Sequence, residues 1–471
     1  MIAADLALSG GTVVTMDSKR QIIEDGLVLI LGSDIVFVGR RSTAPSYQAK
    51  RTIDATDHWV IPGLIDAHGH AGHSLVKTMG DQPGGNWLKV AEKVYFQYAT
   101  EDFWYAEARL AGLERLRFGV TTGYSMLGNI PRADDPTWAI HHAKGMQTIG
   151  IRDILGLGPG PPPWPKPVQI WHGGEPVSSS FSWETAVAVT EAVCERITRG
   201  EFGDRISIHV SPSQIGNPAG LGDDTLQRQT EAVMRLAQTY DVMINAHAYG
   251  GGIAYAYEHL DILGPRTVLA HCAGISAEEV AYLAETDTRV VHCPSARALV
   301  RQGWCPVINL LDAGATVAIG TDGSGPDRTF CLFKDLRIAT IIHRLHEQND
   351  AIFPPGKLLE MITVDAARAL GVEQHLGALE VGKRADVVLV DARKAHQYPP
   401  VMPVHRLVYE TSGQDVSTVI VDGEILLLEG VAVGIDESAV LSEAQAEFTA
   451  MLERSGFEDL LSESPHVWGS R

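Results

Sequence analysis

Histidine and carboxylate side chains recur at the ends of short apolar runs in the middle of the chain. His68 and His70 follow one run in IDAHGH, His247 another in MINAHAYG, His271 a third in VLAHCAG, and Asp322 a fourth in IGTDGSG. Because residues i and i+2 of a strand share a face, His68 and His70 can point their imidazoles at one metal ion. Each residue alone also fits a plainer role, as a hydrogen-bonded histidine or a turn aspartate before glycine. Four strand ends that carry such residues favour a shared metal site.

The number and spacing of the cysteines argue against thiolate metal ligands and leave histidine and carboxylate as the candidates. The chain has 5 cysteines, an odd number without a C-x-x-C pair, against 18 histidines. Neither a disulfide framework nor a thiolate zinc cage is indicated, so imidazole and carboxylate remain as metal ligands. Cys272 and Cys293 directly follow histidines on predicted strands, and alternation should turn their side chains away from a cavity and into the core.

Eight apolar runs alternate with amphipathic stretches whose apolar spacing is close to 3.6 residues. This rhythm predicts a parallel sheet with helices between its strands. The predicted strands span 60–67, 119–126, 145–154, 205–210, 241–246, 267–272, 289–293 and 316–322. Eight βα units over roughly 300 residues match a (β/α)8 TIM barrel, an α/β fold whose active sites lie at the carboxyl ends of the strands.

Short alternating strands with Gly and Asp turns mark both ends of the chain, which predicts one small β-sandwich built from both termini. We therefore expect a composite sandwich over 1–58 and 374–435, a barrel over 59–373, and a C-terminal helix and tail over 436–471. The acidic C-terminal helix has one apolar face, which we expect to serve packing or an oligomer contact.

One connection, 156–174, is so rich in proline and glycine that we expect no regular structure in it. It would lie at the rim of the barrel, either as a rigid surface loop or as a lid that shapes a pocket. Secondary candidates for substrate contact are His209, His292, Tyr249 and Trp87, with Trp164 and Trp171 as further aromatic candidates. Structural hydrogen bonds or plain packing compete with substrate contact for each of them.

The composition describes an ordinary soluble protein that avoids nucleic acid. The 471 residues include 38 Lys+Arg and 58 Asp+Glu, and the formal net charge of −20 repels phosphate backbones and favours a neutral or cationic substrate. Asp5 stands where a signal peptide needs a basic start, and no stretch of about 18 apolar residues occurs. We therefore expect a cytoplasmic protein without a membrane partner.

Taken in order, PGLIDAHGH, NAH, AHC, HCP, GTDG and LGALEVGKRADVVLVD resemble the amidohydrolase superfamily over nearly the whole chain. Within it, GTDGSG and FCLFKDLRIATIIHR are most similar to the branch of triazine hydrolases and of guanine and S-adenosylhomocysteine deaminases. The resemblance implies a barrel with a terminal sandwich. It also implies that His68, His70, His247 and Asp322 bind one divalent ion, while His271 is a fifth ligand or holds the metal-bound water.

Two departures from the family pattern sharpen the expected chemistry. Binuclear members carry a carboxylated lysine on strand four, whereas this chain has ISIHVSPSQ there, which favours a mononuclear site. Deaminases of the branch read H-x-H-x-x-E on strand five, and the glutamate shuttles protons. This chain reads NAHAYG, with Gly250 at the glutamate position. Glycine cannot supply the acid that a ring nitrogen and a leaving amine need, a contribution of about 10² to 10⁴ in rate.

The Asn-x-His pattern at strand five resembles the phenylurea and molinate hydrolases, which cleave urea and thiocarbamate herbicides and thus degrade xenobiotics. We therefore expect a metal-dependent hydrolase that attacks the carbonyl of an amide, urea or (thio)carbamate in a small, neutral molecule. In the expected mechanism Asp322 takes the proton of the metal-activated water and returns it to the leaving amine or thiolate, while His271 orients the nucleophile.

Two other readings remain open. One is an aminohydrolase or dechlorinase acting on a purine, pterin or s-triazine ring, with a proton shuttle from another residue. The other is an inactive barrel that serves as a binding protein, which the presence of all four ligands argues against. The expected cofactor is one divalent ion, with zinc first and manganese, cobalt or iron as alternatives. The resemblance also suggests a homo-oligomer, a dimer or tetramer.

Overall fold

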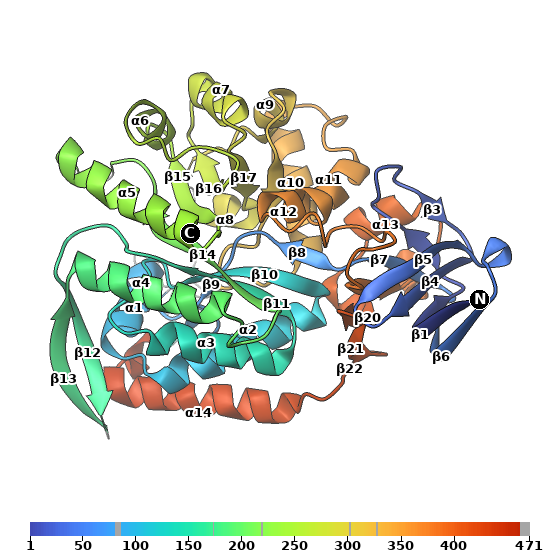
Figure 1. The fold of residues 1–471 in the computed structure, drawn as a ribbon, viewed down its shortest axis with the longest axis horizontal. Coiled ribbons are helices and arrows are strands. Elements are labelled where there is room, and N and C mark those ends of the chain that lie inside the picture. Colours follow the sequence, from blue (N-terminus) through green and yellow to red (C-terminus); the bar gives the residue numbers. More distant parts are fainter. Residues whose placement is uncertain (81–85, 173, 218–219, 301–302, 326–327, 462–471) are drawn as a thin grey trace, which may run out of the picture.

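The computed structural model describes residues 1–80, 86–172, 174–217, 220–300, 303–325 and 328–461. Eight parallel strands form the central sheet in the order β8-β10-β11-β14-β15-β16-β17-β18. Their bounds are Leu64–Asp66, Val120–Leu127, Arg152–Leu157, Ile206–Gln214, Ile244–Tyr249, Thr267–Ala273, Arg289–His292 and Val317–Ile319. Helices surround this sheet (Figure 1), and the predicted (β/α)8 barrel is confirmed.

The helices follow the strands as the apolar spacing predicts. They are α1 Trp87–Gln97, α2 Glu101–Arg117, α3 Thr137–Ile149, α4 Trp183–Thr198, α5 Asp223–Thr239, α6 Gly252–His259, α7 Ala277–Glu285, α8 Pro294–Val300, α9 Val307–Asp312, α10 Leu332–Glu347, α11 Pro355–Met361 and α12 Val364–Ala369. Local sequence fixes several starts. At α7, the Ser276 hydroxyl accepts from the Glu279 amide while the Glu279 carboxylate accepts from the Ser276 amide, a reciprocal capping box.

The barrel closes at the carboxyl ends of its first and last strands. Gly69 forms a parallel bridge with Asp322, and the Asp322 amide donates a 2.8 Å hydrogen bond to the His68 carbonyl. Just below, the Asp66 carboxylate accepts from the amide and the hydroxyl of Thr321, each at 2.9 Å. Two of the expected metal ligands are thus fixed to each other through the backbone.

The sandwich combines strands from both ends of the chain. One sheet holds β1 Ile2–Ser9, β4 Gly26–Leu31, β5 Asp34–Arg40 and β6 Tyr47–Asp54. The other holds β2 Thr12–Val14, β3 Ile22–Ile23, β7 His58–Pro62, β19 Val387–Asp391, β20 Val416–Val421, β21 Glu424–Leu428 and β22 Val431–Ala432. Leu8 and Val28 pack in one buried cluster with Val387 and Ile420 from the far end of the chain. Figure 1 shows this sandwich beside the barrel, at the end that carries the N-terminus.

The predicted strand 60–67 is two strands that belong to two domains. It breaks at Gly63, so that β7 pairs with β19 in the sandwich and β8 begins the barrel. A Cβ at Gly63 would lie 2.1 Å from the Thr121 hydroxyl oxygen, so a glycine is required where the chain passes β10.

Two further predictions about connections need correction. The predicted strand 145–154 begins in α3, which ends at Gly150 with a left-handed φ of 87° before β11 starts at Arg152. The connection 156–174 was expected to be irregular, but β12 (Lys166–His172) and β13 (Glu175–Phe181) form an antiparallel hairpin. Proline is tolerated there because both strands of a two-stranded sheet are edges.

The C-terminal helix α14 (Glu437–Ser455) lies along α2 of the same chain (Figure 1). Arg117 pairs with Glu437 at 2.6 Å, and Arg454 donates to the Tyr98 carbonyl at 2.8 Å. The helix therefore has a packing role within the chain. Across the described residues, none of the helices combines the length and the apolar character that crossing a membrane requires.

Candidate metal centre

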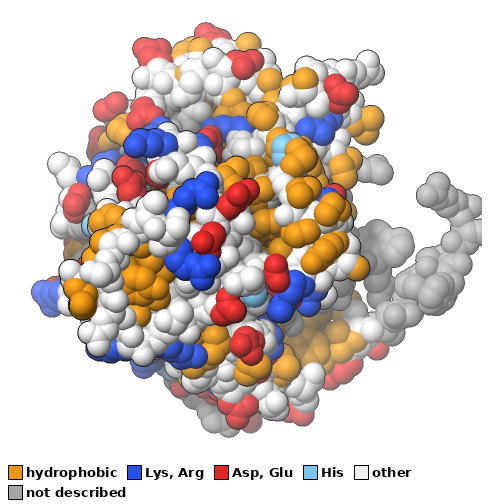
Figure 2. Space-filling model, turned by 90° about the vertical axis from the view of Figure 1, so that its right-hand side faces the viewer, with side chains coloured by type: hydrophobic (Ala, Val, Ile, Leu, Met, Phe, Trp, Pro, Cys, Tyr) orange, Lys and Arg blue, Asp and Glu red, His pale blue; other side chains and the backbone are white. Residues whose placement is uncertain are grey.

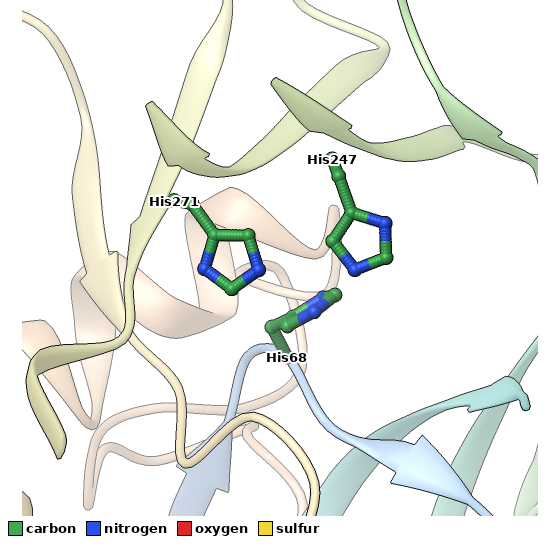
Figure 3. Close-up of side chains that lie close together, drawn as sticks. All are labelled: His68, His247 and His271. Carbon is green, nitrogen blue, oxygen red and sulfur yellow. The ribbon is translucent and has the colours of Figure 1, made fainter. Parts of the chain in front are cut away.

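The five expected metal-site residues converge at the carboxyl end of the barrel. His68 follows β8, His70 begins β9 (His70–Ala71), His247 lies in β15, His271 lies in β16, and Asp322 follows β18. All five are buried, with at most 9% of any one exposed. Figure 3 shows the rings of His68, His247 and His271 turned toward one another from three separate segments.

Distances between the side chains match a shared ion. The ring of His68 lies 5.0, 5.1 and 5.4 Å from the rings of His70, His247 and His271. Nε2 of His70 lies 3.3 Å from Nε2 of His247 and 3.1 Å from Oδ1 of Asp322. In two triads that share His68, all the ligand atoms offered lie within 4.8 Å of one another. Ligands that each lie about 2.1 Å from one zinc ion are neighbours at such distances.

Backbone carbonyls orient two of the imidazoles. Nδ1 of His70 lies 2.8 Å from the Gly128 carbonyl oxygen, and Nδ1 of His247 lies 2.7 Å from the Ser213 carbonyl oxygen. Since a carbonyl can only accept, each Nδ1 carries the proton and each Nε2 presents its lone pair to the centre. Hydrogen bonds of this kind fix the tautomer and the ring direction of metal-binding histidines.

Burial keeps three of the imidazoles neutral, and a nearby cation keeps the carboxylate charged. Burial lowers the pKa of His68 and His271 well below the usual range and that of His247 to about 3. Burial alone would raise the pKa of Asp322, but the Arg328 guanidinium and the His70 hydrogen bond together hold it well below its usual range. Neutral imidazoles and an ionised carboxylate are the forms that bind metals.

The ligand set fits a divalent cation. Among the described residues, neither ring nitrogen of His68 has a hydrogen-bond partner, nor does Nδ1 of His271. Several lone pairs and one negative charge in a buried space are costly without a positive charge between them. Imidazole nitrogens with one carboxylate oxygen are ligands that zinc accepts, as do cobalt, iron and manganese.

Two of the site residues adopt unusual backbone conformations. His271 has a φ of 74° and Asp322 a φ of 63°, both in the left-handed region that non-glycine residues rarely occupy. Ser213, whose carbonyl holds His247, has a φ of 74°. Such conformations persist where surrounding structure imposes them, and they cluster at functional sites.

A cavity of about 560 Å³ opens beside the histidines and Asp322. Trp87 and Tyr249, both expected as substrate contacts, line it together with His73, Arg297 and Arg328. The Tyr249 ring stacks on His271 with centroids 5.7 Å apart, and burial raises the pKa of Tyr249 to about 12. The cavity therefore places a polar wall next to the metal-site residues.

His209 and His292, the other expected substrate contacts, do not line this cavity. His209 lies 5.8 Å from the ring of Tyr124, a member of the interior cluster, and burial lowers the pKa of His209 to about 3. His292 turns outward to α10, where its Nε2 lies 3.1 Å from Nε2 of His343. The two-residue period of β17 explains this, because Val291 packs inside.

Cys293 and Cys272 are both fully buried core residues, as expected. Cys272 packs in the outer cluster, whereas Cys293 packs in the interior cluster with Val291 and Tyr124, so it faces the inside of the barrel.

The two rim tryptophans are structural. Trp171 donates to the Gln97 carbonyl at 2.8 Å, and Trp164 packs edge-on against Phe181 at 5.4 Å.

Among the cavity residues that the sequence analysis did not identify are His73, Arg297 and Arg328. His73 stacks on His70 with centroids 4.8 Å apart and meets the Trp87 ring at 4.7 Å. Its signal was visible, since HGHAGH contains a third histidine. Arg297 in α8 and Arg328 before α10 stand in no motif that marks them as cavity residues.

Gly250 stands in a closed space. A Cβ at this position would lie 2.1 Å from the Gly274 carbonyl oxygen and 2.8 Å from its carbonyl carbon. Backbone atoms cannot move aside as a flexible side chain can. No larger side chain fits at position 250 in this backbone.

Comparisons with known proteins agree with this architecture. The sequence matches the profile of the Amidohydrolase family over residues 59–426. It is 27% identical to a 5'-deoxyadenosine deaminase of Methanosarcina mazei, with 94% of this chain and 97% of the relative covered. It is 30% identical to a 5-methylthioadenosine/S-adenosylhomocysteine deaminase of Symbiobacterium thermophilum, with 89% and 93% covered.

Solved structures show the same fold at lower identity. An adenosine deaminase from Xanthomonas campestris with bound zinc has a TM-score of 0.81 at 23% identity, covering 96% of this chain and 99% of that one. Atrazine chlorohydrolase from Arthrobacter aurescens, complexed with zinc, has a TM-score of 0.76 at 22% identity, covering 94% and 100%. The profile match and the relative at 30% identity show that the chain belongs to the amidohydrolase family and is a hydrolase.

Proposed function

We propose that the protein hydrolyses the carbonyl group of an amide, urea or (thio)carbamate in a small molecule. The observation that carries this proposal is the closed space at Gly250. A ring deaminase needs an acid at that position to protonate the ring nitrogen and the leaving amine, and the Gly274 carbonyl oxygen at 2.1 Å excludes any side chain there. A carbonyl substrate needs an activated water and one base, which the remaining residues supply.

The metal ion, Asp322 and His271 each have a separate role in the proposed hydrolysis. A divalent ion, for which we propose zinc, would lower the pKa of a bound water and polarise the carbonyl. Asp322 is ionised, so one of its carboxylate oxygens can accept the proton of the attacking water and then deliver it to the leaving nitrogen or sulfur. His271 is neutral and orients the nucleophile beside it.

A second candidate function is aminohydrolysis of a purine ring, and the names of the relatives favour it over the first. Both relatives described above are named as deaminases of adenine nucleosides. In this case a cavity residue other than position 250 would have to move the protons. The candidate for this proton transfer is His73, which lines the cavity and stacks on His70.

One assay separates the two candidates. Purified protein loaded with zinc, cobalt or manganese is incubated with an aryl urea, an aryl thiocarbamate and 5'-deoxyadenosine, and release of aryl amine, thiol and ammonia is measured. Metal-dependent release of aryl amine or thiol supports carbonyl hydrolysis. Ammonia release from 5'-deoxyadenosine alone overturns it in favour of the second candidate, and no turnover on any substrate contradicts both.

A further inference from the structure

Tyr249 and Arg297 form a polar pair on the cavity wall that the ligand set does not use. Tyr249 ends β15, two residues after His247, and its ring stacks on His271 at 5.7 Å with an interplanar angle of 23°. Arg297 comes from α8, is 6% exposed, and places its guanidinium carbon 5.9 Å from the centre of the Tyr249 ring. Both residues line the cavity.

A hydrogen bond between the two side chains can have only one direction. The Arg297 guanidinium faces the Tyr249 ring, and its positive charge opposes the rise that burial causes in the pKa of the Tyr249 hydroxyl. A guanidinium has donors and no acceptor, so Arg297 can only donate to the tyrosine oxygen. The tyrosine hydrogen then stays available to an acceptor in the cavity. An arginine next to this hydroxyl therefore favours its use as a donor.

The position of Tyr249 and Arg297 indicates which charge on a substrate they can stabilise. Arg297 faces Tyr249, whose ring stacks on His271, and it lines the same cavity, so its positive charge lies close to the reaction centre. Arg328, the other cavity arginine, lies 3.6 Å from Asp322 and donates to the Gly323 carbonyl at 3.0 Å. These contacts indicate that Arg328 positions the carboxylate of Asp322, the proposed base. Arg297 and Tyr249 instead stand beside His271, where a substrate carbonyl would face the attacking water.

We propose that Tyr249, held by Arg297, donates a hydrogen bond to the substrate carbonyl oxygen and stabilises the negative charge that develops there. This inference rests on the proposed carbonyl hydrolysis. Water oxygen bonds to the carbonyl carbon, the π electron pair moves to oxygen, and the water proton goes to Asp322. The C=O bond then re-forms, and the leaving nitrogen or sulfur departs with its bonding electrons and takes the proton from Asp322.

Tyr249→Phe tests the pair, because it keeps the ring on His271 and removes only the hydroxyl. Loss of one oriented donor of this kind costs about 10² to 10³ in kcat. On the aryl urea or thiocarbamate that the metal-loaded wild type cleaves, we expect kcat to fall about 100-fold while KM stays within threefold. Arg297→Met should give a similar loss, and Arg297→Lys should recover part of it.

A binding readout makes the test independent of turnover. A 4-nitrophenyl phosphonate monoester carries the tetrahedral, negatively charged centre that the pair should recognise, and its inhibition or direct binding constant should weaken at least 30-fold in Tyr249→Phe. Tyr257→Phe is the matched control, because Tyr257 stacks on Tyr282 away from the cavity. Metal content and melting temperature are measured for every variant.

The outcomes separate the inference from the function on which it rests. Unchanged kcat and unchanged phosphonate affinity in Tyr249→Phe overturn the proposed role of Tyr249 and Arg297, whatever the wild type cleaves. If the wild type only deaminates 5'-deoxyadenosine, the proposed function is wrong. The phosphonate affinities of wild type and Tyr249→Phe then show whether Tyr249 and Arg297 recognise a negatively charged tetrahedral centre.

Discussion

Individual residues of the centre are held to different degrees. His70 and His247 are each fixed by a hydrogen bond to a backbone carbonyl, whereas His68 has no such partner among the described residues. Asp322 combines contacts to His70 and to Arg328, so its carboxylate is both a ligand candidate and the nearest base. Residue identity therefore matters most at Asp322 and at the closed position 250.

Asp322→Asn should abolish most activity while the metal stays bound. Asparagine keeps the size and one oxygen of aspartate but cannot accept a proton. We expect kcat to fall by about 10² to 10⁴, the usual contribution of a general base. The measurement is kcat together with metal content of the same sample. Turnover that persists in a metal-replete variant would show that another group is the base.

Gly250→Glu should destabilise the protein without creating a deaminase. The new Cβ would meet the Gly274 carbonyl oxygen at 2.1 Å, and overpacking of this kind costs on the order of 1–3 kcal/mol. Gly252→Ala is the matched control, because its Cβ would meet the nearest atom, the Ile215 carbonyl oxygen, at an ordinary 3.4 Å. Thermal unfolding and ammonia release are measured. A variant as stable as wild type that releases ammonia from 5'-deoxyadenosine would refute the closed-space argument.

At the scale of elements, helix α2 supports the metal-bearing strands through one buried arginine. Arg115 is fully buried and contacts Asp66 in β8 at 3.2 Å and Asp153 in β11 at 3.4 Å. It also donates to the Ser125 hydroxyl at 2.7 Å. Asp66 in turn holds Thr321 next to Asp322, so this helix reaches the point of barrel closure.

Arg115→Met should therefore strongly lower the free energy of unfolding. It leaves two buried carboxylates without their cation, and breaking a buried ion pair costs about 3–5 kcal/mol. Arg109→Met on the same helix removes a partly exposed pair with Glu443 and should cost about 1 kcal/mol or less. Urea unfolding of both variants is the measurement. Equal losses in the two would mean that the Asp66–Arg115–Asp153 cluster does not stabilise the barrel.

The contact between α8 and α10 should make stability depend on pH. Asp335 accepts from the Ser295 hydroxyl at 2.6 Å, and burial raises the pKa of Asp335 to about 7. The folded state thus keeps a proton that the unfolded state loses near pH 4. This contribution to stability is present at low pH and is lost as pH rises toward 7, at up to about 1.4 kcal/mol per pH unit.

Asp335→Asn keeps an oxygen acceptor for Ser295 and removes the titration. Relative to wild type, the variant should therefore gain stability between pH 5 and pH 8. Melting temperatures of both proteins across this range test the prediction. Parallel curves for the two proteins would contradict a raised pKa at Asp335.

At the scale of the whole molecule, the centre joins segments that lie far apart in the sequence. Its residues come from the start of the barrel, from β15 and β16, and from the strand that closes the sheet. On the face shown in Figure 2, acidic and basic side chains are interspersed among apolar ones, so the described residues form no continuous basic surface there.

Removal of the metal should loosen the closure of the barrel. Because a ligand that binds only the folded state stabilises it, metal present at about 100 times its Kd contributes about 2.7 kcal/mol. We expect dialysis against a chelator to lower the melting temperature, and re-addition of zinc to restore it. His68→Ala should lose most of this difference. An equal melting temperature before and after chelation would argue against a metal at this site.

Much of the site could be predicted because its signals are local. Histidine and aspartate at the ends of apolar runs, together with the order of motifs, identified His68, His70, His247, His271 and Asp322, and the structure brings all five together. The barrel followed from eight repeats of one rhythm. The hairpin at 166–181 and the start of β11 were not predicted, because proline tolerance and helix ends depend on the neighbours of a segment.

The sequence by itself determined the fold class, the family and the residue types of the centre, because periodicity and motif order are properties of consecutive residues. Only the tertiary structure decided that His292 faces α10 while Tyr249 and Arg297 share the cavity wall. One residue of register turns a side chain to the other face of a strand, and contacts between β15 and α8 depend on how distant segments pack. The closed space at Gly250 has the same origin, since the atom that excludes a side chain belongs to Gly274 on the neighbouring loop.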